Sequence, residues 1–295
     1  MFLVTGATGN LGRRIVRLLR ERNQPVRALV RLTSRYSELE DRGAEILIGD
    51  LQRPADLAKA CQGAQFVISA HGSNEASGDG AEELDYRANI ELIDQAKAAG
   101  VQHFVFISVL GADRNYEDAP VFKAKRAVEK YLQASGLSYT ILRPSGFASN
   151  LLPLAERFRQ TGVYLLIGDP QSRTSIVSTD DLAKIAIACV SVEAAHNQIF
   201  AVGGPEIMTR SAIPRLFSRI FQREPILINP PLFALDGLRT VVGWVNPSLQ
   251  TSLGTLRTLL AHEFFCTTAE TERLESVFDL KLETLEAFLR RYLDI

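Results

Sequence analysis

The chain has few cysteines and no cluster of metal-binding side chains. It has 3 cysteines and 4 histidines in 295 residues. Cys61, Cys189 and Cys266 lie far apart and form no C-x-x-C pair. Such spacing excludes a disulfide framework and offers no metal-ligand pattern, so we expect free thiols, no metal site and a reducing compartment, the cytoplasm.

Other absences narrow the function classes further. No apolar run reaches the ~18 residues of a spanning helix, and no charged leader with a cleavage site is visible, so we expect no transmembrane segment. With 33 basic and 34 acidic residues the net charge is −1, which gives no field to attract nucleic acid. Gly-x-Ser-x-Gly and Gly-Lys-Ser/Thr motifs are also missing, which disfavours hydrolases and P-loop proteins.

What the chain does have is a regular alternation of short apolar runs with longer helical patterns. The runs are almost continuously apolar, as in strands that are buried on both faces. Strict alternation predicts a doubly wound parallel sheet with right-handed crossovers, an α/β Rossmann fold. We expect strands at residues 2–6, 25–31, 44–50, 65–72, 103–111 and 138–146.

The rhythm changes after about residue 151. We therefore expect a Rossmann domain over residues 1–150 and a mixed segment over 151–295, which completes the sheet and forms a smaller C-terminal α+β region for a substrate or partner. Within it, residues 226–260 are apolar. The stretch 232–245 is consistent with an amphipathic helix on a membrane surface or partner, or with a helix that covers a substrate cleft.

A glycine-rich stretch, "TGATGNLG", joins the first strand to the first helix. Gly6, Gly9 and Gly12 recur every third residue. In a dinucleotide-binding loop the first glycine permits the turn, the second lets the backbone approach the diphosphate, and the third lets helix and strand pack closely. The helix from Asn10 would direct its free N–H groups at the phosphates, and Thr8 can add a hydrogen bond.

The end of the second strand distinguishes the two nicotinamide dinucleotides. An acidic residue there binds a free ribose 2′-hydroxyl, whereas a basic residue accommodates a 2′-phosphate. This chain has "ALVRLTSR", with no acid and with Arg31 and Arg35 available. Because a guanidinium pairs well with phosphate, we predict NADP(H) rather than NAD(H), helped by Arg13 just after the glycines.

At this point the motifs resemble a known family. "TGATGNLG", "ALVR", "GDL", "ISVLGA" and "LRPSGF" are similar to those of atypical short-chain dehydrogenases/reductases, and most of all to the NmrA-like group with its isoflavone-reductase-like, quinone-reductase and Ycf39-type relatives. The resemblance covers residues 1–210 well and the tail loosely. The family implies an NAD(P)-binding Rossmann fold.

The resemblance also implies a set of cofactor contacts at matching positions. These are Gly6, Thr8, Gly9, Asn10 and Leu11 at the diphosphate, Arg31 at the 2′-phosphate, Asp50 and Leu51 at the adenine edge, Ser69 and Ala70 beside the ribose, and Pro144, Ser145 and Phe147 along the nicotinamide. Lys125 would join them as a clamp.

Catalysis in this superfamily uses a serine, a tyrosine and a lysine, with the last two spaced Tyr-x-x-x-Lys. Ser108 and Lys125 match the serine and lysine, but Val121 stands where the tyrosine is expected, and valine cannot donate a proton. Lys125 either serves alone as acid or base or only holds the cofactor. His71, after the fourth strand, remains a candidate site residue.

Two further tyrosines are weaker candidates. Tyr116 lies in the polar stretch "DRNYEDAP" and is expected to face solvent, and Tyr86 on a long helical pattern is expected to pack in the core. The paired carboxylates Asp180 and Asp181 precede a helix, which we expect Thr179 or Asp180 to cap. The basic residues of "RRIVRLLRER" are expected to form a solvated face.

Two functions remain open from the sequence. The first is an oxidoreductase that transfers hydride from NADPH to a small carbonyl, quinone or enone. The second is a non-catalytic NAD(P)-binding protein, NmrA-like or Ycf39-like, that regulates or assembles a protein partner. Peripheral membrane contact is compatible with either.

Overall fold

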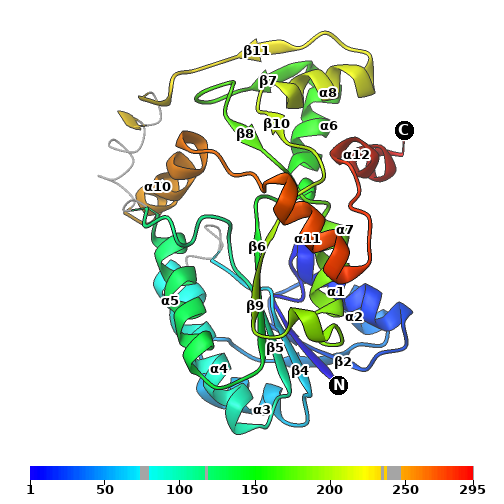
Figure 1. Ribbon diagram of the computed structural model, residues 1–295, viewed down its shortest axis with the longest axis vertical. Coiled ribbons are helices and arrows are strands. Elements are labelled where there is room, and N and C mark those ends of the chain that lie inside the picture. The colour runs from blue at the N-terminus through cyan, green and yellow to red at the C-terminus, as the bar shows by residue number, and fades with distance from the viewer. Residues whose placement is uncertain (74–79, 117–118, 234–235, 238–246, 295) are drawn as a thin grey trace.

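The structure is a computed structural model, and it describes residues 1–73, 80–116, 119–233, 236–237 and 247–294. Its centre is a seven-stranded sheet in the order β3-β2-β1-β4-β5-β6-β9 (Figure 1). All neighbours are parallel. The predicted doubly wound parallel sheet is therefore confirmed. Its strands are β1 (Phe2–Thr5), β2 (Val26–Val30), β3 (Glu45–Ile48), β4 (Phe66–Ser69), β5 (His103–Ile107), β6 (Tyr139–Pro144) and β9 (Gln198–Val202).

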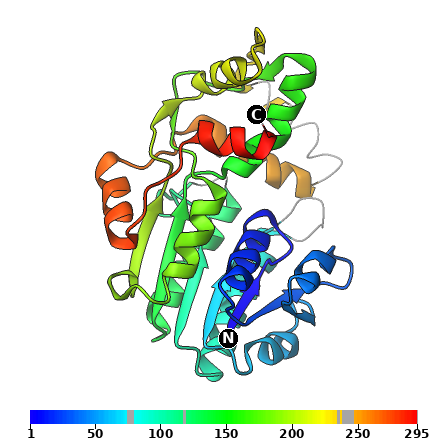
Figure 2. The same cartoon turned by 90° about the vertical axis from the view of Figure 1, so that its right-hand side faces the viewer.

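Helices cover both faces of this sheet, as Figures 1 and 2 show. One face carries α1 (Asn10–Glu21), α7 (Thr179–Ala188) and α11 (Thr268–Phe278), with α2 (Ser37–Asp41) beside them; the other carries α3 (Pro54–Cys61), α4 (Ala88–Ala98) and α5 (Pro120–Ala134). Each face buries its own apolar cluster. Burial of one Leu or Phe side chain contributes about 1.5–3 kcal/mol, so the two clusters dominate the stability of the sheet.

The strand order reverses beside β1. The chain runs outward through β2 and β3, then returns to place β4 on the other side of β1. A crevice opens at such a switch point, beyond the carboxyl ends of the strands, and ligands of doubly wound proteins bind there. The ends of β1 and β4 are therefore the first place to look for a site.

A smaller α+β region lies above the carboxyl edge of the sheet (Figure 1). It is inserted between β6 and β9, and it continues after β9 toward the C-terminus. Its two short sheets pair β7 with β11 and β8 with β10. Its elements are α6 (Leu152–Thr161), β7 (Val163–Leu165), β8 (Arg173–Thr174), β10 (Met208–Thr209), α8 (Ala212–Phe221), β11 (Ile226–Ile228), α10 (Pro247–Ala261) and α12 (Leu285–Leu293).

The basic face of α1 is solvated only in part: Arg22 is exposed, but Arg14 and Arg17 bind a carboxylate on α7. Arg14 Nε lies 3.0 Å and Arg17 Nη2 3.2 Å from Asp180 Oδ1 on α7, and the Arg14 side chain is only 11% exposed. Arg291 lies 2.8 Å from the other oxygen of Asp180. These hydrogen-bonded guanidinium groups hold the pKa of Asp180 below its usual value, against the effect of burial. Asp180 thus ties α1 to α7 and to the C-terminus.

The cap of α7 also differs from the prediction. Ser178, one residue before the predicted Thr179, accepts a hydrogen bond from the backbone N–H of Asp181 at 3.4 Å. The carboxylate of Asp181 instead accepts one from the backbone N–H of Glu283 at 2.7 Å.

Three further expectations concern the cysteine thiols, metal sites and membrane-spanning helices, and the apolar stretch near the C-terminus. Burial raises the pKa of each cysteine thiol, in Cys61 and Cys266 to about 12, so all three are inert core residues. Among the described residues there is no group of side chains that could hold a metal ion and no helix long and apolar enough to cross a membrane. Of the stretch 232–245, which is expected to be an amphipathic helix, residues 232, 233, 236 and 237 are described, and the others lie outside the described residues.

Candidate functional site

The glycine loop connects β1 to α1 with almost no space for side chains. Gly6 has φ +68°, and a Cβ there would lie 2.6 Å from the carbonyl oxygen of Ala70. A Cβ on Gly12 would lie 2.1 Å from the carbonyl oxygen of Gly6. At Gly9 the only close atom is that same oxygen, at 3.3 Å. Gly6 and Gly12 therefore serve the packing of strand, loop and helix, whereas Gly9 leaves space open on the outer side of the loop.

The start of α1 has no side-chain cap. Its N-cap residue is Gly9, and among the described residues no side chain caps it. The same holds for α2 to α6 and for α8, whereas Ser178, Thr267 and Thr284 cap α7, α11 and α12. Uncapped N–H groups at a helix start, together with the positive end of the helix dipole, are what a phosphate group binds.

A cavity of about 350 Å³ lies directly in front of this helix start. It brings together seven of the residues expected from the family resemblance, which come from the ends of β1 to β4: Gly6, Thr8, Gly9, Arg31, Asp50, Leu51 and Ala70. His71 also lines it, together with Leu29, Val30, Ser34, Gly49, Gln52, Gly72 and Leu84. Three other expected residues do not line the cavity: Asn10 and Leu11, which follow Gly9 in the chain, and Ser69, which precedes Ala70.

Arg31 and Arg13 differ in their surroundings. Arg31 is exposed and lines the cavity beside Ser34. Arg13 supports the segment that carries Arg31 and Ser34. It donates to the backbone oxygens of Thr8 at 2.8 Å and of Arg35 at 2.6 Å. Its third contact is an ion pair with a glutamate of α2. Arg13 therefore connects the glycine loop to the Arg31–Arg35 segment.

Lys125 is buried on α5 and is surrounded by acceptors. Its Nζ lies 3.2 Å from Asp85 Oδ1 and 3.2 Å from each of the backbone oxygens of His71 and Ile107. The two charged side chains are 7% and 1% exposed. An ammonium group has three N–H bonds, and three acceptors face it. Lys125 therefore makes two hydrogen bonds to backbone oxygens and an ion pair with Asp85, whose Oδ1 has no hydrogen-bond partner among the described residues.

Asp85 reaches Lys125 from an unusual helix. Residues Ala81–Arg87 form a π-helical turn that continues into α4. Asp85 also accepts a hydrogen bond from the backbone N–H of Ser73 at 3.0 Å. Wide turns of this kind occur often at functional sites because they redirect a side chain.

His71 lies between the cavity and this ion pair. Its Nδ1 is 2.8 Å from the Thr5 hydroxyl and 3.3 Å from that of Ser69, and among the described residues its buried Nε2 has no hydrogen-bond partner. Burial, and then the charge of Lys125, lower the pKa of His71, so the ring is neutral at ordinary pH.

Ser108 points away from Lys125. Its hydroxyl donates at 2.7 Å to Glu129, which is fully buried and is also bound by Arg143 and Arg126. The two residues that match the family's serine and lysine therefore belong to two separate hydrogen-bond networks.

A second cavity of about 310 Å³ lies between the end of β6 and the upper region. Ser145 and Phe147 line it on the sheet side, as does Phe264, with Pro144 buried just before them. The remaining wall is mainly apolar and includes Leu151, Tyr164, Leu166, Ile176, Ile213, Leu259 and Leu260. Burial raises the pKa of Tyr164 to about 12, so its hydroxyl is neutral.

Two arginines that line this cavity, Arg173 and Arg210, bind groups of the surrounding wall. Arg173 forms an ion pair with Glu263, at 2.7 Å. Arg210 donates to the backbone oxygens of Leu259 and Leu260 and, at 3.0 Å, of His262, at the end of α10. The cavity therefore presents carbon surface rather than charge to an occupant.

Comparison with known proteins identifies the family. Residues 6–193 match the family model described as NAD(P)H-binding. The chain is an atypical short-chain dehydrogenase/reductase of the NmrA-like, Ycf39-like group. The photosystem II assembly factor Ycf39 of Guillardia theta is 32% identical over 247 residues, which cover 82% of this chain and 77% of that protein. The NAD(P)H azoreductase of Xenophilus azovorans is 32% identical over 223 residues, with 74% and 73% covered.

The fold has close solved counterparts. An NADPH-dependent quinone oxidoreductase from Escherichia coli, solved with NADPH, superposes with a TM-score of 0.80 over 99% of this chain and 100% of that one, at 21% identity. The dehydrogenase/reductase family thus includes assembly factors and reductases on the same NAD(P)H-binding scaffold.

The residues present fit such a dinucleotide. The start of α1 and the open space at Gly9 suit a diphosphate, and Arg31 lines the same cavity. Ser145 and Phe147, which the family resemblance puts beside the nicotinamide, line the second cavity and not the first.

The expectation that Tyr116 faces solvent is wrong. Its ring is half-buried, with its centre 5.2 Å from that of Phe122 and 4.6 Å from that of His262. Tyr86 packs at the edge of the α3–α5 cluster, as expected. Val121 lies partly exposed in the first turn of α5.

Sequence reasoning missed Asp85 and Glu129, the acids that engage Lys125 and Ser108. A signal for Asp85 exists: in "AEELDYRANIEL" Asp85 and Asn89 are four residues apart, on the helix face that also carries Ala81, Ala88 and Leu92. A polar pair within an apolar stripe indicates a buried polar network.

Proposed function

We propose that this protein is an NADPH-dependent oxidoreductase that reduces a small apolar carbonyl, quinone or enone. The observation that carries the proposal is the apolar cavity of about 310 Å³ beyond the end of β6, with Ser145 and Phe147 in its wall. When bound, the nicotinamide supplies hydride transfer. In this proposal residues 1–150 hold the cofactor, and residues 151–295 shape the substrate or partner site.

The proposed cofactor contacts are those expected from the family. Gly6, Thr8, Gly9, Asn10 and Leu11 surround the diphosphate, Arg31 the 2′-phosphate, Asp50 and Leu51 the adenine, Ser69, Ala70 and Lys125 the riboses, and Pro144, Ser145 and Phe147 the nicotinamide. NADP(H) is favoured because Arg31 lines the pocket and no acid follows β2.

An Arg31→Ala variant is expected to bind NADPH about tenfold more weakly while its affinity for NADH changes little, because only NADPH carries the 2′-phosphate that a guanidinium pairs with. The measurement is titration of both cofactors by nucleotide fluorescence. An Arg22→Ala variant, which removes an exposed guanidinium at the end of α1, is the matched control. An equal loss of affinity for NADPH and NADH would show that Arg31 does not bind the 2′-phosphate.

The side chains at the site favour one kind of acceptor. Val121 cannot donate a proton, and both Lys125 and Ser108 are engaged by buried acids. A ketone needs a proton delivered as it is reduced. A quinone gives a stabilised oxyanion that can take its proton from water, so quinones suit this chain better than simple ketones.

A second function has its own support. The strand β11 exposes three apolar side chains, with Ile226 58%, Leu227 50% and Ile228 50% exposed, and Phe233 nearby is 74% exposed. An exposed apolar edge strand is a common docking surface for a protein partner. With Val121 at the tyrosine position, the alternative is a non-catalytic NAD(P)H-binding regulatory or assembly protein.

Turnover assays separate the two functions. Purified protein is given NADPH with a panel of quinones, enones and ketones, and absorbance is followed at the nicotinamide band. We expect NADPH oxidation with quinones above that with ketones. Tight NADPH binding without turnover on any acceptor would reject the reductase and leave the assembly role. Failure to bind either nucleotide would reject both.

A further inference from the structure

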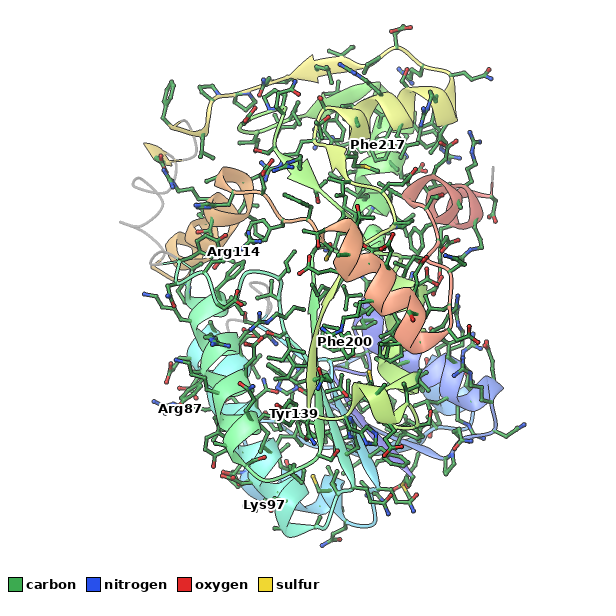
Figure 3. The ribbon with its side chains drawn as sticks, in the orientation of Figure 1. Arg87, Lys97, Arg114, Tyr139, Phe200 and Phe217 are labelled. Atoms are coloured by element: carbon green, nitrogen blue, oxygen red, sulfur yellow. The ribbon has the colours of Figure 1, made fainter. Side chains whose placement is uncertain are left out.

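A third cavity lies outside the dinucleotide pocket and the apolar cavity. It measures about 590 Å³ and lies over β6 and β9, between α5 and α11. In Figure 3 Phe200 is labelled on β9, with α5 on one side and α11 on the other. None of its lining residues lines the dinucleotide pocket or the apolar cavity. We refer to it as the β9 groove.

Four guanidinium groups line the β9 groove: those of Arg114, Arg126, Arg143 and Arg273. They come from the loop after β5, from α5, from β6 and from α11, so residues far apart in the sequence meet here. Two of the carboxylates nearby, Asp113 and Glu270, also line the groove.

Arg143 is fixed in the wall of the groove. Its Nε and Nη2 donate to the two oxygens of Glu129 at 2.8 and 2.7 Å, and its Nη1 lies 2.5 Å from Asp113. Glu129 is fully buried and also accepts from Arg126 at 3.0 Å. These contacts hold the pKa of Arg143 above its usual value and that of Asp113 below it, against burial in each case.

Two more arginines are held by aromatic rings. The guanidinium carbon of Arg273 lies 4.7 Å from the ring centre of Phe200, and its Nη2 donates to the side chain of Gln198 at 2.8 Å. The guanidinium carbon of Arg114 lies 5.5 Å from the ring centre of Phe264, and its Nη1 donates to the backbone oxygen of Glu263 at 2.7 Å. Stacking against a ring orients the planar guanidinium and lowers the entropy lost when it binds a ligand.

The carboxylates around the β9 groove already have partners within the protein. Glu270 is engaged by Thr267 in the capping box of α11, with oxygen–nitrogen and oxygen–oxygen distances of 2.7 and 2.8 Å. Asp113 is paired with Arg143, and Glu129 is shared between Arg143 and Arg126. Glu263, near Arg114, is likewise paired with Arg173. Among the described ion pairs, Arg114 and Arg273 therefore have no carboxylate side chain as a partner, and the nearby carboxylates are already engaged.

We propose that the β9 groove is a binding site for a small organic anion that carries phosphate or carboxylate groups. The guanidinium of Arg273, with Arg114 and Arg126, would pair with the anionic groups in two-point contacts. The floor of the groove contains Leu110 and Ile199, which suit a carbon skeleton. This site would be occupied independently of the cofactor, and it stands whether or not the protein is a reductase.

Calorimetric titration tests the proposal with two probes, inorganic pyrophosphate and citrate. Saturating NADPH is present throughout, so that the start of α1 is not available to the phosphate probe. We expect binding in the micromolar to millimolar range by at least one probe, and the stronger probe identifies the preferred anionic group. The double variant Arg126→Gln/Arg273→Gln should bind it at least about tenfold more weakly.

Arg87→Gln is the matched control, since Arg87 is 64% exposed and its ion pairs within the described part of the chain are with Glu82 and Glu83, away from the groove. Circular dichroism and thermal unfolding confirm that each variant is folded. If the double variant is not folded, Arg114→Gln alone replaces it, with the same expected weakening. Absence of binding by both probes at millimolar concentration, or equal affinity in the parent and the folded groove variant, would overturn the proposal.

Discussion

A Gly12→Ala variant is expected to lose about 3 kcal/mol of its free energy of unfolding, because the added methyl group has no space. Its carbon would lie 2.1 Å from the Gly6 carbonyl oxygen and 2.7 Å from the Cα of Ala7. Both are backbone atoms, so strand, loop and helix must separate to relieve the overlap. Urea denaturation followed by circular dichroism measures the loss.

Gly9→Ala is the matched comparison in the same loop. Gly9 has φ −78°, which alanine adopts readily, and its Cβ would meet only one atom, at 3.3 Å. We expect stability within about 1 kcal/mol of the parent, but NADPH binding weaker by about tenfold or more, because the methyl group occupies the space that the diphosphate needs.

The predictions for the two variants can be contradicted independently of each other. If Gly12→Ala were as stable as Gly9→Ala, the close packing of α1 on the loop would be wrong. If Gly9→Ala bound NADPH like the parent, the loop would not hold the diphosphate, and the proposed cofactor site would have to be abandoned.

The second large effect is expected at the buried pair of Lys125 and Asp85. Lys125→Met removes the ammonium group and leaves Asp85, 1% exposed, with only the backbone N–H of Ser73 as a described partner. An uncompensated buried charge costs about 3–5 kcal/mol. Asp85→Asn likewise leaves the buried ammonium group of Lys125 without its carboxylate partner. Each single variant is therefore expected to unfold at much lower urea concentration than the parent.

The double variant Asp85→Asn/Lys125→Met removes both charges together, so most of the loss should be recovered. A double-mutant cycle on the free energy of unfolding measures this coupling. Lys97→Met, on the exposed face of α4, is the control for lysine removal and should change stability by less than about 0.5 kcal/mol. Strictly additive losses would mean that the two charges do not interact in the folded protein.

The same variants bear on the role of Lys125. If it only positions the cofactor, Lys125→Met should raise the Kd for NADPH while leaving the pH profile of turnover unchanged. If it acts as an acid or base, the variant should lose a limb of that profile.

The sequence predicts the elements around β1 and α1 well because local chemistry determines them. Glycine spacing, an apolar strand and an amphipathic helix are all contained in a short stretch, and the strand–helix alternation then implies the parallel sheet. The seven predicted residues that line the dinucleotide pocket all follow the ends of β1 to β4, where a doubly wound sheet places its ligand.

Contacts between distant segments could not be predicted in this way. Asp180 lies 166 residues from Arg14, and nothing near either residue indicates that they meet. Asp85 is forty residues from Lys125, and a π-helical turn, which has no recognisable sequence pattern, brings it there. The polar neighbours of Tyr116 predict a solvent-facing ring, but Phe122 on α5 and two residues from a distant part of the chain, at 262 and 264, pack against it.

Because β9 is the last strand of the sheet and follows the inserted upper region, exchanging specificity between relatives cannot be done by joining two halves at residue 150. A fragment ending there would leave β6 unpaired on one side and α1 without α7. A working chimera has to transplant the insertion between β6 and β9 together with the C-terminal helices, while keeping α7 and β9 from the recipient.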